Sequence, residues 1–374
     1  MKKILSAALA ILLVSLGLYL GAQQLDSSSG GSASSKKDLI IYNWGDYIDP
    51  DLITKFEKQT GYHVIYETFD SNEAMYTKIK QGGTAYDLAV PSDYMITKLR
   101  RDNLLDKIDT SRLSNFKYIG KEFLHKSFDE KNEYSVPYFW GTLGIVYNDR
   151  YVKKGEIKSW NDLWKKKYQG QILLVDSARD IMGMSLVSMG YSMNDTNSAH
   201  LKVAKAKLDK IGKNVKAIVA DELKMYMVQN EAWIGVTYSG EAATMMDQDS
   251  HIHYVVPAQG SNLWFDNIVI PKTCKNKEAA YKFINFMLEP KNAAQNAEYI
   301  GYSTPNTAAQ KLLPKSVRED KQFYPPMSTV KNLEVYRDLP SSKVQEYNDL
   351  FLEFKMYARN YLTENFRKRK FHAV

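Results

Sequence analysis

From residue 38 onward, the chain alternates between short apolar runs and amphipathic segments, and this alternation limits the folds that it can adopt. Apolar runs of strand length occupy residues 39–44, 63–69 and 86–92. The segment between the first two has helical periodicity, with Asp49 at the N-cap position, Pro50 in the first turn and Gly61 at the end. Strands that alternate with helices predict the α/β class, in which a mostly parallel sheet carries helices on both faces.

The same alternation returns in the second half of the chain. It covers residues 170–190, 197–212 and 216–246, and then 251–271 and 276–290. A chain of 374 residues is long enough for two domains of about 100–200 residues each. Two α/β units predict two lobes, and the ligands of such sheets lie beyond the carboxyl ends of the strands. We therefore expect a ligand cleft between the lobes.

The N-terminal segment has a different composition. Two lysines precede an apolar run that ends at Ala22, which is typical of an export signal. The run is just long enough to cross a bilayer, which takes about 20 residues, and Leu20 makes a poor cleavage site. We expect an uncleaved anchor over residues 1–22 rather than a cleaved signal peptide, followed by a Ser/Gly-rich linker over 23–37. Either alternative exports the rest of the chain, to the outer face of the cytoplasmic membrane or the periplasmic space.

Composition excludes several classes of function. A single cysteine, Cys274, rules out an internal disulfide, a cysteine-rich zinc site and a CxxC redox pair. The net charge of +7 comes from basic residues that are mostly interspersed with acids, so we expect no nucleic-acid partner for an exported chain. The sequence has no GxSxG, phosphate-loop or dinucleotide motif, and it predicts neither an enzyme nor a cofactor. His251 and His253 form an HxH pair without an evident third ligand, so we expect no metal site.

Aromatic, hydroxyl and acidic side chains gather where the predicted strands end. They are Trp44, Asp46, Tyr47, Ser92 and Tyr94 in the first half, and Ser177, Asp180, Tyr238, Glu241, Trp264, Asp266 and Tyr302 in the second. Aromatic faces attract cations by about 0.5–2 kcal/mol, and carboxylates form charge-assisted hydrogen bonds with ammonium groups. This lining suits a flexible polycation with alkyl spacers. Such a ligand would also supply the counter-ion for Asp266, a charge within a predicted buried strand.

Each of these residues also has a purely structural alternative. Asp180 could cap a helix or form a turn, and Glu241 could be an acid in the first turn of a helix. Trp44 and Trp264 could fill a core, and Tyr302 could plug the interface between the lobes. The prediction of a binding site therefore depends on the joint occurrence of these side chains.

Several stretches resemble one known family. The stretches are YNWGDYIDPDLITKFEKQTG, ETFDSNEAMYTKIK, YDLAVPSDYM, SVPYFWGTLGIVYN, SWNDLW and EYIGYSTPN. In this order they resemble the spermidine/putrescine-binding proteins of polyamine ABC importers, from about residue 38 to residue 355. The resemblance implies a two-lobed periplasmic-binding-protein fold of type II. Each lobe would be a mixed, mostly parallel sheet flanked by helices, and the protein would close around a polyamine and dock on a membrane permease.

The resemblance also implies roles for individual residues. Rings that wall the ligand match Trp44, Tyr47, Tyr94, Trp264 and Tyr302, while Asp46, Ser92 and Asp266 match the acidic and hydroxyl positions. The sequence departs from the family pattern at three places. Ser177 and Asp180 stand where the family commonly has two acids. Tyr238 occupies a position that can hold Trp, and Tyr336 occupies a position where Gln is expected. One carboxylate is thus lost, and Glu241 or Asp46 could offset it.

These arguments predict an exported, monomeric binding protein that captures spermidine or putrescine and delivers it to an ABC importer. We expect residues 38–143 and 262–306 to form one lobe and residues 144–261 and 307–374 to form the other. Two alternatives stay open at this point. One is a binding protein for another small cationic solute, and the other is a surface interaction protein without a transport role.

Overall fold

The computed structural model describes residues 37–220 and 222–371, and no side chain is described from residue 360 onward. The expected anchor over residues 1–22 and nearly all of the linker therefore lie outside the described residues. No helix in the described part of the chain is both long enough and apolar enough to cross a membrane.

The first sheet contains three parallel strands in the order β2-β1-β3. They are β1 (Asp38–Trp44), β2 (His63–Phe69) and β3 (Leu88–Ala89), and the helices α2 (Pro50–Thr60), α3 (Asn72–Gln81) and α4 (Asp93–Arg101) follow them in turn. The predicted ends of α2 are confirmed. Asp49 accepts a hydrogen bond from the N–H of Asp51, and Gly61 ends the helix with a φ of 72°, a conformation that glycine adopts readily.

The second sheet has the strand order β6-β5-β7-β4-β8. Its strands are β4 (Val136–Asn148), β5 (Ile172–Val175), β6 (Val215–Val219), β7 (Ile234–Tyr238) and β8 (Ile252–Val255). The pairs formed by β5 are parallel, whereas β4 runs antiparallel to β7 and β8. The expected α/β class is confirmed, with an antiparallel part that the alternation alone did not indicate.

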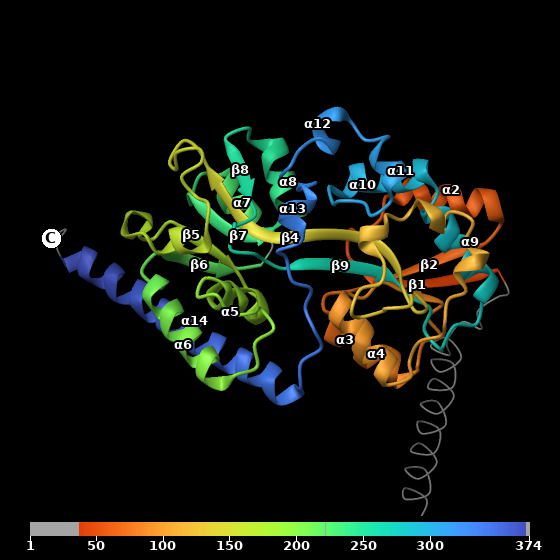
Figure 1. The fold of residues 1–374 in the computed structure, drawn as a ribbon, viewed down its shortest axis with the longest axis horizontal. Coiled ribbons are helices and arrows are strands. Elements are labelled where there is room, and N and C mark those ends of the chain that lie inside the picture. The colour runs from red at the N-terminus through yellow and green to blue at the C-terminus, as the bar shows by residue number, and fades with distance from the viewer. Residues whose placement is uncertain (1–36, 221, 372–374) are drawn as a thin grey trace, which may run out of the picture.

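Strand β4 connects the two halves of the molecule (Figure 1). Its first part, up to Thr142, pairs with β9 (Leu263–Ile268), and its second part, from Leu143, pairs with β7 and β8. The transition between the two sets of partners therefore falls at Thr142 and Leu143.

Each half of the molecule has its own core. One contains buried residues between 39 and 140 and between 263 and 313, and the other contains residues between 143 and 236 and between 336 and 358. We call these halves lobe 1 and lobe 2. The lobe boundaries given above remain a prediction, and Ala309 and Leu313, beyond the expected boundary at residue 306, pack in the core of lobe 1.

The remaining helices surround the two cores. Lobe 2 carries α5 (Ala178–Val187), α6 (Ser198–Ile211), α7 (Glu222–Val228), α8 (Ser239–Gln248) and α14 (Ser341–Phe371). The other helices are α9 (Lys277–Met287), α10 (Pro290–Ile300), α11 (Thr307–Gln310), α12 (Lys315–Arg318) and α13 (Met327–Val330). The figure shows α5, α6 and α14 together on one side of lobe 2, while α3 and α4 lie on the same side of lobe 1 (Figure 1).

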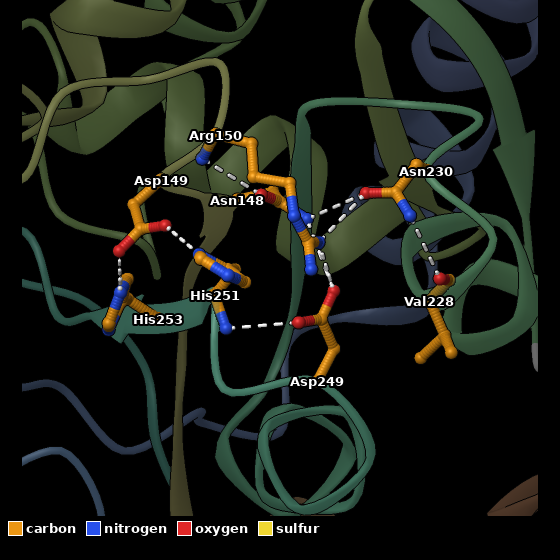
Figure 2. Close-up of polar contacts among 8 residues, drawn as sticks. All are labelled: Asn148, Asp149, Arg150, Val228, Asn230, Asp249, His251 and His253. Carbon is orange, nitrogen blue, oxygen red and sulfur yellow. Dashed lines mark hydrogen bonds and ion pairs between the residues drawn. The ribbon is translucent and has the colours of Figure 1, made fainter.

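The HxH pair lies at the outer end of β4 (Figure 2). His251 Nδ1 is 2.7 Å from one carboxylate oxygen of Asp149, and His253 Nε2 is 2.8 Å from the other. Beside them, Arg150 forms an ion pair with Asp249. The two histidines therefore join β8 to the end of β4, and within the described residues no group of three or more metal-ligating side chains could hold an ion.

Candidate functional site

Asp266 is the acidic residue of lobe 1 in the candidate site. It lies in β9 opposite Phe139 of β4, and its side chain is only 8% exposed. Tyr47 Oη donates a hydrogen bond to one carboxylate oxygen at 2.5 Å, and Ser92 Oγ donates to the other at 2.7 Å. Burial raises the pKa of Asp266 to about 6, although both hydrogen bonds act in the opposite direction. Within this strand, the carboxylate of Asp266 is thus stabilised by hydrogen bonds from two hydroxyl groups.

Asp180 is its counterpart in lobe 2. It lies in the first turn of α5 and is 3% exposed. Tyr238 Oη donates to one carboxylate oxygen and Tyr336 Oη to the other, each at 2.6 Å. Burial raises the pKa of both phenols well above the ordinary value, and the neighbouring Asp180 charge raises it further. Both phenols therefore stay protonated, so they remain hydrogen-bond donors to Asp180.

Neither carboxylate has a cationic partner among the described side chains, which end at residue 359. None of the ion pairs among the described residues includes Asp180 or Asp266. A buried charge without a counter-charge is unfavourable by several kcal/mol, even where hydrogen bonds satisfy its oxygens. A cation would therefore be stabilised beside each of the two acids.

Aromatic rings from both lobes lie next to these acids. The rings of Trp264 and Tyr302 meet edge to face with centroids 5.3 Å apart, and those of Tyr47 and Tyr302 meet in the same way at 5.6 Å. Tyr238 of lobe 2 approaches Trp264 at 6.5 Å. Among the described residues, the indole N–H groups of Trp44 and Trp264 are buried without a hydrogen-bond partner. Trp264 thus brings to the cluster a ring and a donor that no described acceptor satisfies, whereas the ring of Trp44 packs against Phe69 with centroids 4.6 Å apart.

Other residues of the predicted site have partners that explain them differently. Ser177 caps α5 and accepts from the N–H of Asp180, which is a structural role. Tyr94 packs against both cores, and its hydroxyl lies 3.2 Å from a carboxylate oxygen of Glu73. Asp46 is exposed and has a positive φ of 47°.

Glu241 already has a counter-ion. Lys224 Nζ lies 2.8 Å from one of its carboxylate oxygens, and Tyr302 Oη donates to the other at 3.3 Å. An acid that is paired within the chain has less charge to offer a ligand. This pairing argues against Glu241 as the replacement for the acid that is missing at Ser177.

A third buried acid, Asp93, is not among the residues that the sequence predicted for the site. Asp93 is the first residue of α4, is 1% exposed and accepts hydrogen bonds from the N–H groups of Tyr94 and Phe265. Burial raises its pKa to about 8, and the nearby Asp266 contributes in the same direction. Asp93 thus links α4 to β9 through the N–H of Phe265, the residue between Trp264 and Asp266. The only signal in the sequence was its position in the PSDY stretch.

The candidate site is closely packed. Two small pockets lie in lobe 1, one beside Phe139 and the other beside Tyr66. Neither is lined by any of the predicted site residues. Tyr238 and Glu241 of lobe 2 instead contact Trp264 and Tyr302 of lobe 1, respectively, as expected for a closed arrangement.

Comparisons with known proteins agree with this architecture. Residues 51–325 match the family described as bacterial extracellular solute-binding protein. The spermidine/putrescine-binding periplasmic protein of Escherichia coli K12 is 42% identical over 322 residues, covering 85% of this chain and 92% of that protein. The putrescine-binding periplasmic protein PotF of the same organism is 31% identical, covering 83% and 89%.

A solved structure is similar over a comparable share of the chain. It is the spermidine/putrescine ABC transporter substrate-binding protein PotD of Streptococcus pneumoniae, crystallised in complex with calcium and HEPES. The two chains are 56% identical with a TM-score of 0.81, and the match covers 86% of this chain and 99% of the other.

Proposed function

This chain belongs to the bacterial extracellular solute-binding proteins, and on that basis we propose that it captures spermidine or putrescine between its lobes. The two-lobed fold of type II is that of its structural relatives. The captured polyamine would pass to the membrane permease of an ABC importer, and no chemical step on the ligand is involved. The protein would act as an exported monomer, either anchored at the outer face of the cytoplasmic membrane or located in the periplasmic space.

One observation carries the proposal: each lobe contributes a buried carboxylate that lacks a cationic partner among the described residues. A polyamine has at least two ammonium groups, and amines with a pKa near that of lysine, about 10.4, remain charged at neutral pH. One ammonium group would neutralise Asp266 and another Asp180. The rings of Trp264 and Tyr302 would pack against the methylene groups between them.

This arrangement also couples binding to closure. Because the acids come from different lobes, a ligand that reaches both interacts more strongly with the closed form than with the open one. A ligand with a single ammonium group can neutralise only one of the acids. The proposal therefore predicts a strong preference for diamines and triamines over monoamines.

Titration calorimetry of the full-length protein in mild detergent tests the function. We expect heat of binding with spermidine or putrescine, and binding at least about 100-fold weaker with butylamine, since one buried ion pair is lost. Asp180→Asn and Asp266→Asn should each weaken binding by a similar factor.

Asp176→Asn is the matched control. Asp176 is exposed, precedes the same helix as Asp180 and pairs with Lys355 at 2.6 Å, so its replacement should leave affinity unchanged. The proposal is refuted if neither polyamine produces heat, or if butylamine binds as tightly as putrescine.

A further inference from the structure

Gly240 lies where the ring of Tyr302 meets lobe 2. It is the second residue of α8 and is buried. A Cβ atom added to Gly240 would lie 1.5 Å from Cε1 and 1.6 Å from Cδ1 of Tyr302. Carbon atoms in ordinary contact are about 3.5–4 Å apart, so the ring and the helix would have to separate by about 2 Å. No side chain at position 240 is compatible with the observed position of this ring.

The ring of Tyr302 cannot easily move away from α8. It is enclosed by Trp264 and Tyr47 at 5.3 and 5.6 Å, and by the ring of Phe139 at 6.0 Å, all measured between centroids. Tyr47 and Phe139 are buried in the core of lobe 1. In a close-packed core such rings have little room to shift. A larger residue at position 240 would therefore displace the lobe rather than the ring.

The loop that carries Tyr302 also rests on α8. Gly301 has a φ of 81°, and a Cβ atom added to it would meet Ala243 and Thr244 of α8 at 3.9 Å. The hydroxyl of Tyr302 donates to Glu241, and Lys224 of lobe 2 pairs with that carboxylate. Backbone and side-chain contacts thus hold the ring over the first turn of α8.

This contact lies beside the strand that connects the lobes. The N–H of Trp140 donates to the carbonyl oxygen of Ser303, and the N–H of Thr142 donates to Ser239 Oγ. Both acceptors are next in sequence to the residues in contact, Tyr302 and Gly240. Because β4 changes partners at this point, the contact is close to the axis about which the lobes would rotate. A displacement of about 2 Å near a hinge corresponds to a large change in the opening of the cleft.

We propose that Gly240 is a positioning residue for closure: its missing side chain lets lobe 2 close against Tyr302, and any larger residue holds the cleft partly open. The proposal rests on the function proposed above, because closure around a ligand is its premise. Tyr302 then has two roles: its ring forms a wall of the site, and its contact with α8 limits how far lobe 2 can close.

The test measures closure directly in the full-length protein. Spin labels at Gln81→Cys and Lys202→Cys, with Cys274 replaced by Ser, report the distance between α3 of lobe 1 and α6 of lobe 2. Both label positions are exposed, and the two helices lie on the same side of the molecule (Figure 1). With saturating spermidine, Gly240→Ala should give a longer distance than the parent. Its affinity for spermidine, measured by calorimetry, should fall at least tenfold.

A control variant and a rescue variant distinguish closure from misfolding. A Cβ atom added to Gly83 meets no atom within 4 Å, so Gly83→Ala should give the parent distance. Alanine is also favoured over glycine within a helix, so Gly240→Ala should not lower the thermal midpoint of the ligand-free protein. Adding Tyr302→Ser to Gly240→Ala removes the clash and should restore the parent distance at saturating spermidine, although affinity stays low.

The possible failures can be separated. If the parent binds spermidine and Gly240→Ala reaches the same distance and affinity, the role of Gly240 is refuted while the proposed function stands. A double variant that stays open, or a lower thermal midpoint for Gly240→Ala, also refutes that role. If the parent produces no heat with either polyamine, the proposed function is wrong and the inference fails with it.

Discussion

Replacing Asp266 with asparagine should stabilise the ligand-free protein and at the same time remove most of its affinity for polyamines. Burial raises the pKa of Asp266 from 3.8 to about 6, which means that its ionised form is disfavoured in the folded state. At about 1.36 kcal/mol per pKa unit, this rise corresponds to about 3 kcal/mol once the group is fully ionised. Asparagine avoids this penalty because it carries no charge.

The gain should be smaller than this ceiling. Asp266 accepts from two hydroxyl groups, whereas an asparagine side chain has one acceptor oxygen and a donor NH2 group. Ser92 or Tyr47 would have to reorient to accept a hydrogen bond, and a lost hydrogen bond is worth about 1 kcal/mol. We expect a net stabilisation of about 1–2 kcal/mol at pH 8.

The effect has a defined pH dependence. The folded-state pKa is higher than the unfolded one, so the folded protein keeps a proton that the unfolded chain releases. This contribution to stability is fully present below about pH 4 and is lost as the pH rises through about 6. The advantage of Asp266→Asn should therefore disappear at pH 4 and develop between pH 4 and pH 7.

Urea denaturation of the ligand-free protein at pH 4, 6 and 8 measures this difference, and calorimetry with spermidine at pH 8 measures affinity. We expect the variant to bind at least about 100-fold more weakly, because a buried ion pair is broken. Asp176→Asn serves as the control and should change neither quantity. A variant that is destabilised equally at all three pH values, or that retains parental affinity, would contradict the electrostatic reasoning.

Two further predictions concern other acids. Because Glu241 is neutralised by Lys224, Glu241→Gln should weaken spermidine binding less than tenfold in calorimetry, and a loss as large as that of Asp180→Asn would show that Glu241 does replace the missing acid. Asp162 accepts hydrogen bonds from the N–H groups of Lys158 and Ser159 and pairs with Lys165, and these contacts lower its pKa to about 2 despite partial burial. Its contribution is present above the unfolded pKa of about 4 and is lost as the pH falls towards 2, so Asp162→Asn should be destabilising in urea at pH 7 but neutral at pH 2.

Local patterns in the sequence were sufficient for the α/β class and for the ends of α2, since these depend on neighbours within a few residues. Asp49 caps the helix with its own side chain, and Gly61 ends it because glycine tolerates a positive φ. Ser71 caps α3 in the same way, by accepting a hydrogen bond from the N–H of Ala74. The resemblance to a family added Tyr336, which no local pattern indicated, to the candidate residues.

The chain by itself therefore determined which segments become strands and helices and which side chains stand at their ends, because hydrophobic periodicity and capping act over short distances. Only the tertiary structure decided which of those side chains meet. In the folded chain, Tyr336 donates a hydrogen bond to Asp180, 156 residues away, and Glu241 forms an ion pair with a lysine. Gly240 packs against the ring of Tyr302. Such contacts depend on how close packing brings distant segments together, and no spacing along the chain records them.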